Sequence, residues 1–100
     1  MTTFTDFQGR QIRLTDERRQ HILEHPEMTA LEHELEQTLI EPEKVRRSQS
    51  DPSVILYYRY CKDTIVGEKW LCIVVKILIN DAFILTVYLT NKLKSGESLR

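Results

Sequence analysis

The chain has 100 residues and a formal net charge of −1, which suits one domain and leaves no room for a separate cofactor domain. Its longest apolar run, residues 70–79, contains Lys76 and falls short of the roughly 20 residues that a membrane-spanning helix needs. The N-terminus lacks a basic stretch followed by an apolar one, so no secretory signal is expected. Composition therefore predicts a cytoplasmic domain without a membrane segment.

Charge is divided unevenly along the chain. Residues 1–43 carry ten acidic and four basic side chains, whereas residues 44–100 carry five acidic and ten basic ones. The second half can therefore offer a cationic surface to an anionic substrate. Ordinary surface charge can segregate in the same way, so the pattern alone leaves both interpretations open.

The N-terminal region predicts a weak hairpin and then a helix. Residues 3–7 and 11–14 contain β-formers around a Gln-Gly pair, which favours two short strands. Thr15 precedes two acids, and a hydroxyl cap followed by acids in the first turn is typical of a helix start. We expect this helix to cover residues 16–25, because Pro26 cannot continue the hydrogen-bond ladder.

A second helix is predicted directly afterwards. Thr29 and Glu32 have the spacing of a capping box. Apolar residues then recur every four positions, which gives the helix one buried stripe. The stripe consists of Leu31, Leu35 and Leu39, and Pro42 ends the helix.

The remainder of the chain changes to the period of β-strands. Four segments rich in β-branched and aromatic residues, 44–50, 53–60, 69–79 and 82–90, are separated by short connections. Such consecutive strands predict an antiparallel meander, against which the helices bury their stripes. We therefore expect one α+β domain over residues 1–100, with two N-terminal helices on a four-stranded sheet. The polar end of the chain is expected to be loose, with a last strand or a short helical turn before Gly96.

Two histidines, His21 and His25, share one face of the first predicted helix. Such a pair can exchange protons near neutral pH, bind a metal or lie on the surface without a role. Neither an HExxH pattern nor a third ligand accompanies the pair, so no metal site is predicted. We favour His21 as an acid or base because it lies mid-helix. His25 precedes Pro26 and is kept as a weaker substrate contact that can instead cap the helix end.

Two strand cations interrupt apolar or aromatic runs. Lys76 has Val74 and Leu78 as same-face neighbours under strict alternation, and its amine can bind phosphate or reach water at the sheet edge. Arg59 lies among tyrosines, where a guanidinium can bind phosphate, stack on a base or simply face solvent. Cys61 and Cys72 lack zinc-site spacing, so we expect two free thiols in or near the core.

The position of Lys76 relative to the last strand depends on the turn between them. A two-residue turn pairs Lys76 with Leu85, whereas a three-residue turn pairs it with Thr86. We favour the pairing with Thr86, because it keeps the charge away from the helix-packed core. It also gathers Lys76, Thr86 and Tyr88 into one polar patch.

Three segments taken in order resemble a known nuclease family. The strings LTDERRQHILEHPEM, EPEKVRRSQSDPSVILYYRY and LCIVVKILINDAFILTVYLT resemble the phage-type barnase-EndoU-colicin-RelE-like nuclease domains, from about Ile12 to Lys92. The resemblance implies a barnase/RelE-like fold and RNA cleavage on the exposed sheet face without a metal or cofactor. In such cleavage the ribose 2′-hydroxyl attacks the adjacent phosphate, which requires a base, an acid and cations.

The resemblance also implies roles for individual residues. His21 would be the base or acid, while Arg59 and Lys76 would hold the phosphate and Thr86 would hydrogen-bond it or the ribose. Further substrate contacts would come from Arg46 or Arg47, Tyr58 and Tyr88.

These observations leave three hypotheses. The first is a toxin-like ribonuclease that cleaves tRNA or mRNA and is controlled by an antitoxin or immunity protein. The alternative is an inactive RNA- or protein-binding module of the same fold. The third is a homodimer that packs through the apolar segment 70–79.

Overall fold

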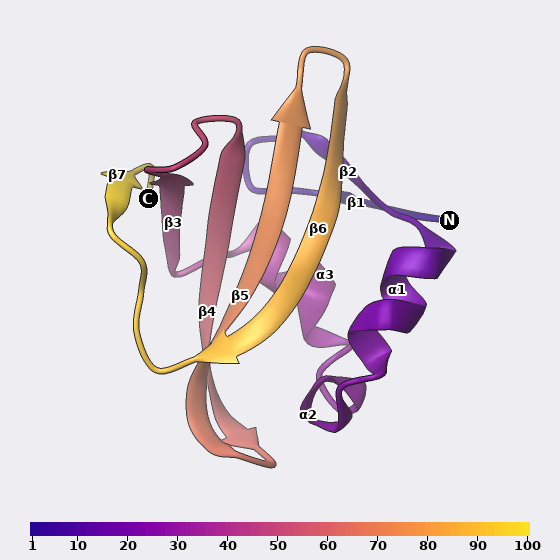
Figure 1. The fold of residues 1–100 in the computed structure, drawn as a ribbon. Coiled ribbons are helices and arrows are strands. Elements are labelled where there is room, and N and C mark those ends of the chain that lie inside the picture. Colours follow the sequence, from indigo (N-terminus) through magenta and orange to yellow (C-terminus); the bar gives the residue numbers. More distant parts are fainter.

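The computed structural model describes all 100 residues as one seven-stranded sheet and three short helices (Figure 1). The strand order across the sheet is β1-β2-β6-β5-β4-β3-β7. No helix is both long and apolar enough to cross a bilayer. In chain order the elements are β1 (Thr2–Thr5), β2 (Gln11–Leu14), α1 (Asp16–Leu23), α2 (Pro26–Thr29), α3 (Glu34–Ile40), β3 (Lys44–Ser48), β4 (Val54–Thr64), β5 (Gly67–Leu78), β6 (Asp81–Thr90) and β7 (Gly96–Ser98).

The expected fold class, two helices on a four-stranded antiparallel meander, is wrong. Helices hold only 19% of the residues, and the sheet is mixed because β2 joins β6 in parallel through Arg13 and Phe83. At the opposite end β7 pairs with β3. The physical reason is that β6 and β3 would otherwise leave their backbone donors and acceptors unpaired at sheet edges, and the short terminal strands satisfy them.

The helices are shorter than expected. α1 starts as predicted, because the Thr15 hydroxyl accepts a hydrogen bond from the Arg18 backbone at 3.1 Å, but it ends at Leu23 rather than at His25. The predicted helix start at Thr29 is also wrong. Thr29 ends the single turn α2, and its hydroxyl points back to the Leu23 carbonyl instead of capping a new helix.

The main core lies between the helices and one face of the sheet, here called the helix face. Leu31, Leu35 and Leu39 are buried there, as the apolar stripe predicted. Tyr57 is also fully buried, and its hydroxyl donates to the Asp6 carboxylate at 2.6 Å. The same carboxylate accepts the backbone amide of Arg10 at 2.8 Å. A buried acid thus ties the β1–β2 hairpin to the centre of the sheet.

The opposite face of the sheet, here called the open face, has no helix over it (Figure 1). It carries a second, smaller apolar cluster of Leu56, Tyr58 and Cys72. Residues 91–95, here called the strap, lead from β6 back to β7 and place Leu93 against this cluster. The backbone amide of Lys94 donates to the Tyr58 hydroxyl at 3.1 Å. The C-terminal end, expected to be loose, is therefore tied to the sheet.

The register between β5 and β6 differs from both registers that the sequence suggested. Lys76 pairs with Phe83, because the hairpin turns tightly after Leu78 and pairs that residue with Asp81. The register then shifts, so that Val74 pairs with Thr86 and Leu85 is the extra residue of a β-bulge. The bulge restores the phase of the pleat, so Lys76 and Thr86 still lie on the same face, the open one.

Candidate functional site

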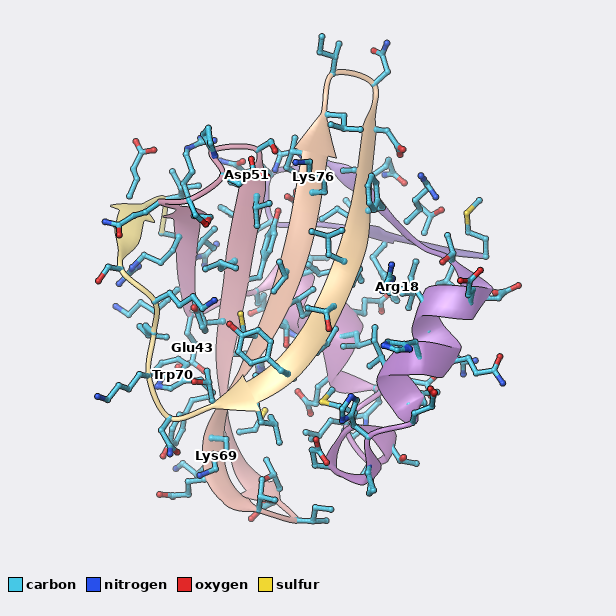
Figure 2. All side chains as sticks on the ribbon, viewed as in Figure 1. Arg18, Glu43, Asp51, Lys69, Trp70 and Lys76 are labelled. Carbon is cyan, nitrogen blue, oxygen red and sulfur yellow. The ribbon has the colours of Figure 1, made fainter.

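Lys76 lies on the open face and is held by an acid from the loop between β3 and β4. Its ammonium is 2.7 Å from the Asp51 carboxylate, and its side chain is 28% exposed. The carboxylate is itself fixed, because it accepts hydrogen bonds from the Ser53 hydroxyl at 2.6 Å and the Ser53 amide at 3.0 Å. These contacts, the one from Lys76 most strongly, lower the pKa of Asp51 to about 2. Figure 2 shows the two side chains together at the ends of β4 and β5.

A second cation–carboxylate pair lies beyond Phe83 on the same face. Arg13 of β2 donates to both Asp81 oxygens, at 2.9 and 2.7 Å, and its guanidinium lies 5.0 Å from the centre of the Phe83 ring. Because Phe83 pairs with Lys76 on one side and with Arg13 on the other, the three side chains form a row across the sheet. Sequence reasoning missed Arg13, since its partner is 68 residues away.

The residue pairing orders the rest of the open face into two further rows. The next row runs from Arg46 on β3 through Leu56 and Val74 to Thr86. Thr86 is exposed, and Arg46 donates to the Ser98 hydroxyl at 3.3 Å without an acidic partner. Lys76, Thr86 and Arg46, three of the residues expected to contact substrate, are therefore on one face.

The third row holds the two tyrosines that were expected to contact the substrate. It runs from Lys44 through Tyr58 and Cys72 to Tyr88. Burial under the strap raises the pKa of Tyr58 to about 12 and that of the Cys72 thiol to about 11. The Tyr88 hydroxyl is buried without a hydrogen-bond partner. Neither hydroxyl is open to a ligand while the strap is in place.

The two histidines are both solvent-exposed. His21 lies on α1, which packs beside β6, and its Nδ1 is 3.7 Å from the Glu24 carboxylate. The exposed fractions are 64% for His21 and 62% for His25, whose Nδ1 is 3.6 Å from Glu27. Figure 2 shows Arg18, one turn before His21, on the side of α1 that faces β6. His25 precedes α2 and makes no side-chain cap.

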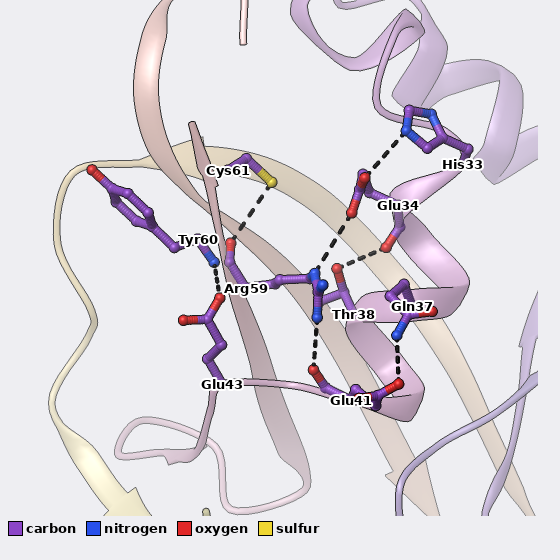
Figure 3. Close-up of polar contacts among 9 residues, drawn as sticks. All are labelled: His33, Glu34, Gln37, Thr38, Glu41, Glu43, Arg59, Tyr60 and Cys61. Carbon is purple, nitrogen blue, oxygen red and sulfur yellow. Dashed lines mark hydrogen bonds and ion pairs between the residues drawn. The ribbon is translucent and has the colours of Figure 1, made fainter. Parts of the chain in front are cut away.

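Arg59 lies on the helix face, away from Lys76. Its guanidinium donates to the Glu41 carbonyl at 3.1 Å and lies 3.6 Å from the Glu34 carboxylate, both belonging to the region of α3 (Figure 3). The alternation of β4 explains this placement, since Tyr57 and Cys61 on either side also face the helices. The structure therefore places Arg59 on the opposite face of the sheet from Lys76 and Thr86, in contact with the region of α3.

The open face carries cations to which an anion could bind. Carboxylates of the protein itself already contact two of these cations. Lys76 and Arg13 each have a carboxylate partner, whereas Arg46 and Lys44 have none. Nowhere in the structure do three His, Cys, Asp or Glu side chains come together in a group that could hold a metal ion. Cys61 and Cys72 are free and buried.

Comparison with known families, characterised proteins and solved structures gave no match.

Proposed function

We propose that this chain acts on RNA at the open face of its sheet, as a ribonuclease that uses no metal ion. The observation that carries the proposal is the shared position of Lys76 and Thr86 on the uncovered face, beside the strand along which α1 packs. That helix supplies Arg18 and His21. In this proposal the imidazole of His21 reaches the border of the open face, where Lys76 and Thr86 offer a cation and a hydroxyl.

These groups fit the chemistry of 2′-hydroxyl attack. A base must remove the hydroxyl proton, an acid must protonate the leaving oxygen, and cations must stabilise charge on the phosphate. In this proposal His21 exchanges the protons, Lys76 binds a non-bridging phosphate oxygen and Thr86 donates a hydrogen bond to the phosphate or ribose. The resemblance to phage-type nuclease domains supports the same assignment for these three residues.

Asp51 sets a condition on this mechanism. Its carboxylate accepts a hydrogen bond from the Lys76 ammonium at 2.7 Å. An RNA phosphate must therefore bind the ammonium together with Asp51 or displace Asp51 from it. An ammonium has three donors, and a second anion can therefore approach without removal of the first. Asp51 would then orient Lys76 towards the phosphate while lowering the net attraction.

A second candidate function is RNA binding without cleavage. It is favoured by the exposure of His21 and by its nearest polar partner, Glu24 of the same helix. It is also favoured by the loss of Arg59 to the helix face. A protein of this kind would hold RNA through Lys76 and the unpaired open-face cations.

The two functions are separated by a cleavage assay with purified protein, tRNA and mRNA in the presence of a chelator. We expect cleavage by the wild type and a loss of about 10²–10⁴-fold in His21→Ala, the usual size of an acid–base contribution. His33→Ala is the matched control, because its imidazole is also solvent-exposed (74%) and has no role in the proposal, and it should cleave normally. Binding without product in the wild type would overturn the ribonuclease and favour the second candidate.

A further inference from the structure

Uncompensated positive charge gathers at the β3 side of the open face. Lys44 and Arg46 point to this face, because they pair with Tyr58 and Leu56. Lys92 and Lys94 of the strap are exposed. None of these four cations has an acidic partner, whereas Arg47, on the other face of β3, pairs with Glu97 at 2.9 Å.

The strap holds its lysines on a fixed backbone. Lys69 donates to the Asn91 side chain at 2.7 Å at the start of the strap, and Leu93 packs on the small apolar cluster. The backbone amide of Lys94 donates a hydrogen bond to the Tyr58 hydroxyl, and the Lys94 ammonium lies 6.0 Å from the centre of the Tyr88 ring. The binding of a ligand there therefore costs little conformational entropy of the strap backbone.

An aromatic side chain lies at the far end of this surface. Trp70 is half-buried in the row beyond Tyr58 and contacts the Tyr60 ring edge-on, with ring centres 5.2 Å apart. Glu43 accepts the amide of Tyr60, the strand partner of Trp70, at 2.8 Å, so an acidic side chain lies at this end of the surface. Cations that follow one another along a surface, together with an aromatic side chain, are typical of proteins that bind single-stranded nucleic acid.

We propose that four cations, here called the basic flank, bind phosphates of a single RNA strand that lie beyond the phosphate at which the strand is cleaved. The basic flank consists of Lys44, Arg46, Lys92 and Lys94. The inference rests on the proposed function, which places the reacting phosphate at Lys76. From there the strand would pass Arg46 and reach Lys44 and the strap along the β3 side of the open face. In this proposal the basic flank supplies affinity for the RNA and fixes the position of the strand, and cleavage takes place at the Lys76 end of the open face.

The test measures binding of an uncleavable 2′-O-methyl oligonucleotide by fluorescence anisotropy over a series of salt concentrations. Lys92→Gln/Lys94→Gln should weaken binding and lower the slope of log Kd against log salt by about 1.4, because each single-strand phosphate contact contributes about 0.7. Lys92→Arg/Lys94→Arg should bind as the wild type does. The control Lys62→Gln/Arg100→Gln removes two cations outside the flank and should leave the slope unchanged.

The outcomes separate this inference from the proposed function. An unchanged slope in Lys92→Gln/Lys94→Gln, an equal loss in the control, or no binding by the wild type overturns the basic flank. If the expected slopes are found but the all-ribose oligonucleotide is not cleaved, the basic flank stands and the ribonuclease fails.

Discussion

The Lys76 ammonium and the Asp51 carboxylate lie 2.7 Å apart, a contact between the end of β5 and the loop before β4. Ser53 holds the carboxylate from the other side. The pair explains why a lysine is tolerated in an otherwise apolar strand, since its charge is matched and its stem covers the open face. It also sets the electrostatics of the surface on which we place the reaction.

The Asp51 carboxylate makes the free energy of unfolding depend on pH in the acid range. Its pKa is lowered to about 2 in the folded protein, against about 3.9 in an unfolded chain. The contribution is therefore complete above about pH 4 and is lost as the pH falls through about 2. We expect the difference in free energy of unfolding between wild type and Asp51→Asn, measured in urea, to shrink over that range. A difference that does not vary with pH would contradict this account.

Arg59 is expected to affect stability rather than RNA. Arg59→Gln removes the contacts to Glu34 and the Glu41 carbonyl and should lower the free energy of unfolding by about 1 kcal/mol. Because the residue lies on the helix face, affinity for the uncleavable oligonucleotide should change less than about twofold. Lys76→Gln serves as the contrast and should weaken binding. A larger effect of Arg59→Gln than of Lys76→Gln on affinity would show that the two faces are wrongly assigned.

The buried Asp6–Tyr57 contact should be the most sensitive hydrogen bond of the N-terminal hairpin. Tyr57→Phe removes the 2.6 Å bond to a carboxylate that is fully buried. Leaving a buried acceptor short of a donor costs about 1–3 kcal/mol, measurable by urea denaturation. Tyr60→Phe is the control, because its hydroxyl bonds to Glu68 at an exposed site, and it should cost under about 0.5 kcal/mol. Equal effects of both variants would refute the proposed importance of the buried acid.

Gly96 allows β7 to lie close against β3. A Cβ atom at this position would lie 2.1 Å from the Arg47 carbonyl oxygen, which is backbone and cannot move aside cheaply. Gly96→Ala should therefore release β7 and speed hydrogen exchange at the Val45 and Leu99 amides, which bond across this pair of strands. Ser95→Ala should leave both amides protected. Unchanged exchange in Gly96→Ala would mean that β7 is not held as described.

Local signals predicted the elements better than their partners. The cap at Thr15 located the start of α1, and the β-formers near the N-terminus gave the hairpin that β1 and β2 form. The boundary at Thr29 was wrong, because a capping-box spacing fits several hydroxyls and tertiary contacts select among the possible helix starts. Partners far apart in sequence, such as Arg13 and Asp81, have no local signature.

The candidate site was predictable only where the alternation of side chains along a strand decides which residues share a face of the sheet. Lys76 and Thr86 fall on one face, yet neither suggested register was right, because a bulge at Leu85 inserts an extra residue that alternation does not reveal. Alternation places Arg59 on the same face of β4 as Tyr57 and Cys61, but it does not tell on which side of the sheet the helices pack. The burial of Tyr58 under the strap depends on the path of a polar segment without a periodic pattern.

The chemistry of the cleaved ends tests the ribonuclease most directly. RNA is incubated with the protein and a chelator, and the product ends are identified by mass spectrometry. Attack by the 2′-hydroxyl predicts a 2′,3′-cyclic phosphate and a 5′-hydroxyl, abolished by a single 2′-deoxy substitution at the cleaved nucleotide and strongly reduced in His21→Ala and Lys76→Gln. Ends with a 5′-phosphate, cleavage that requires added metal, or full activity in both variants would contradict the account.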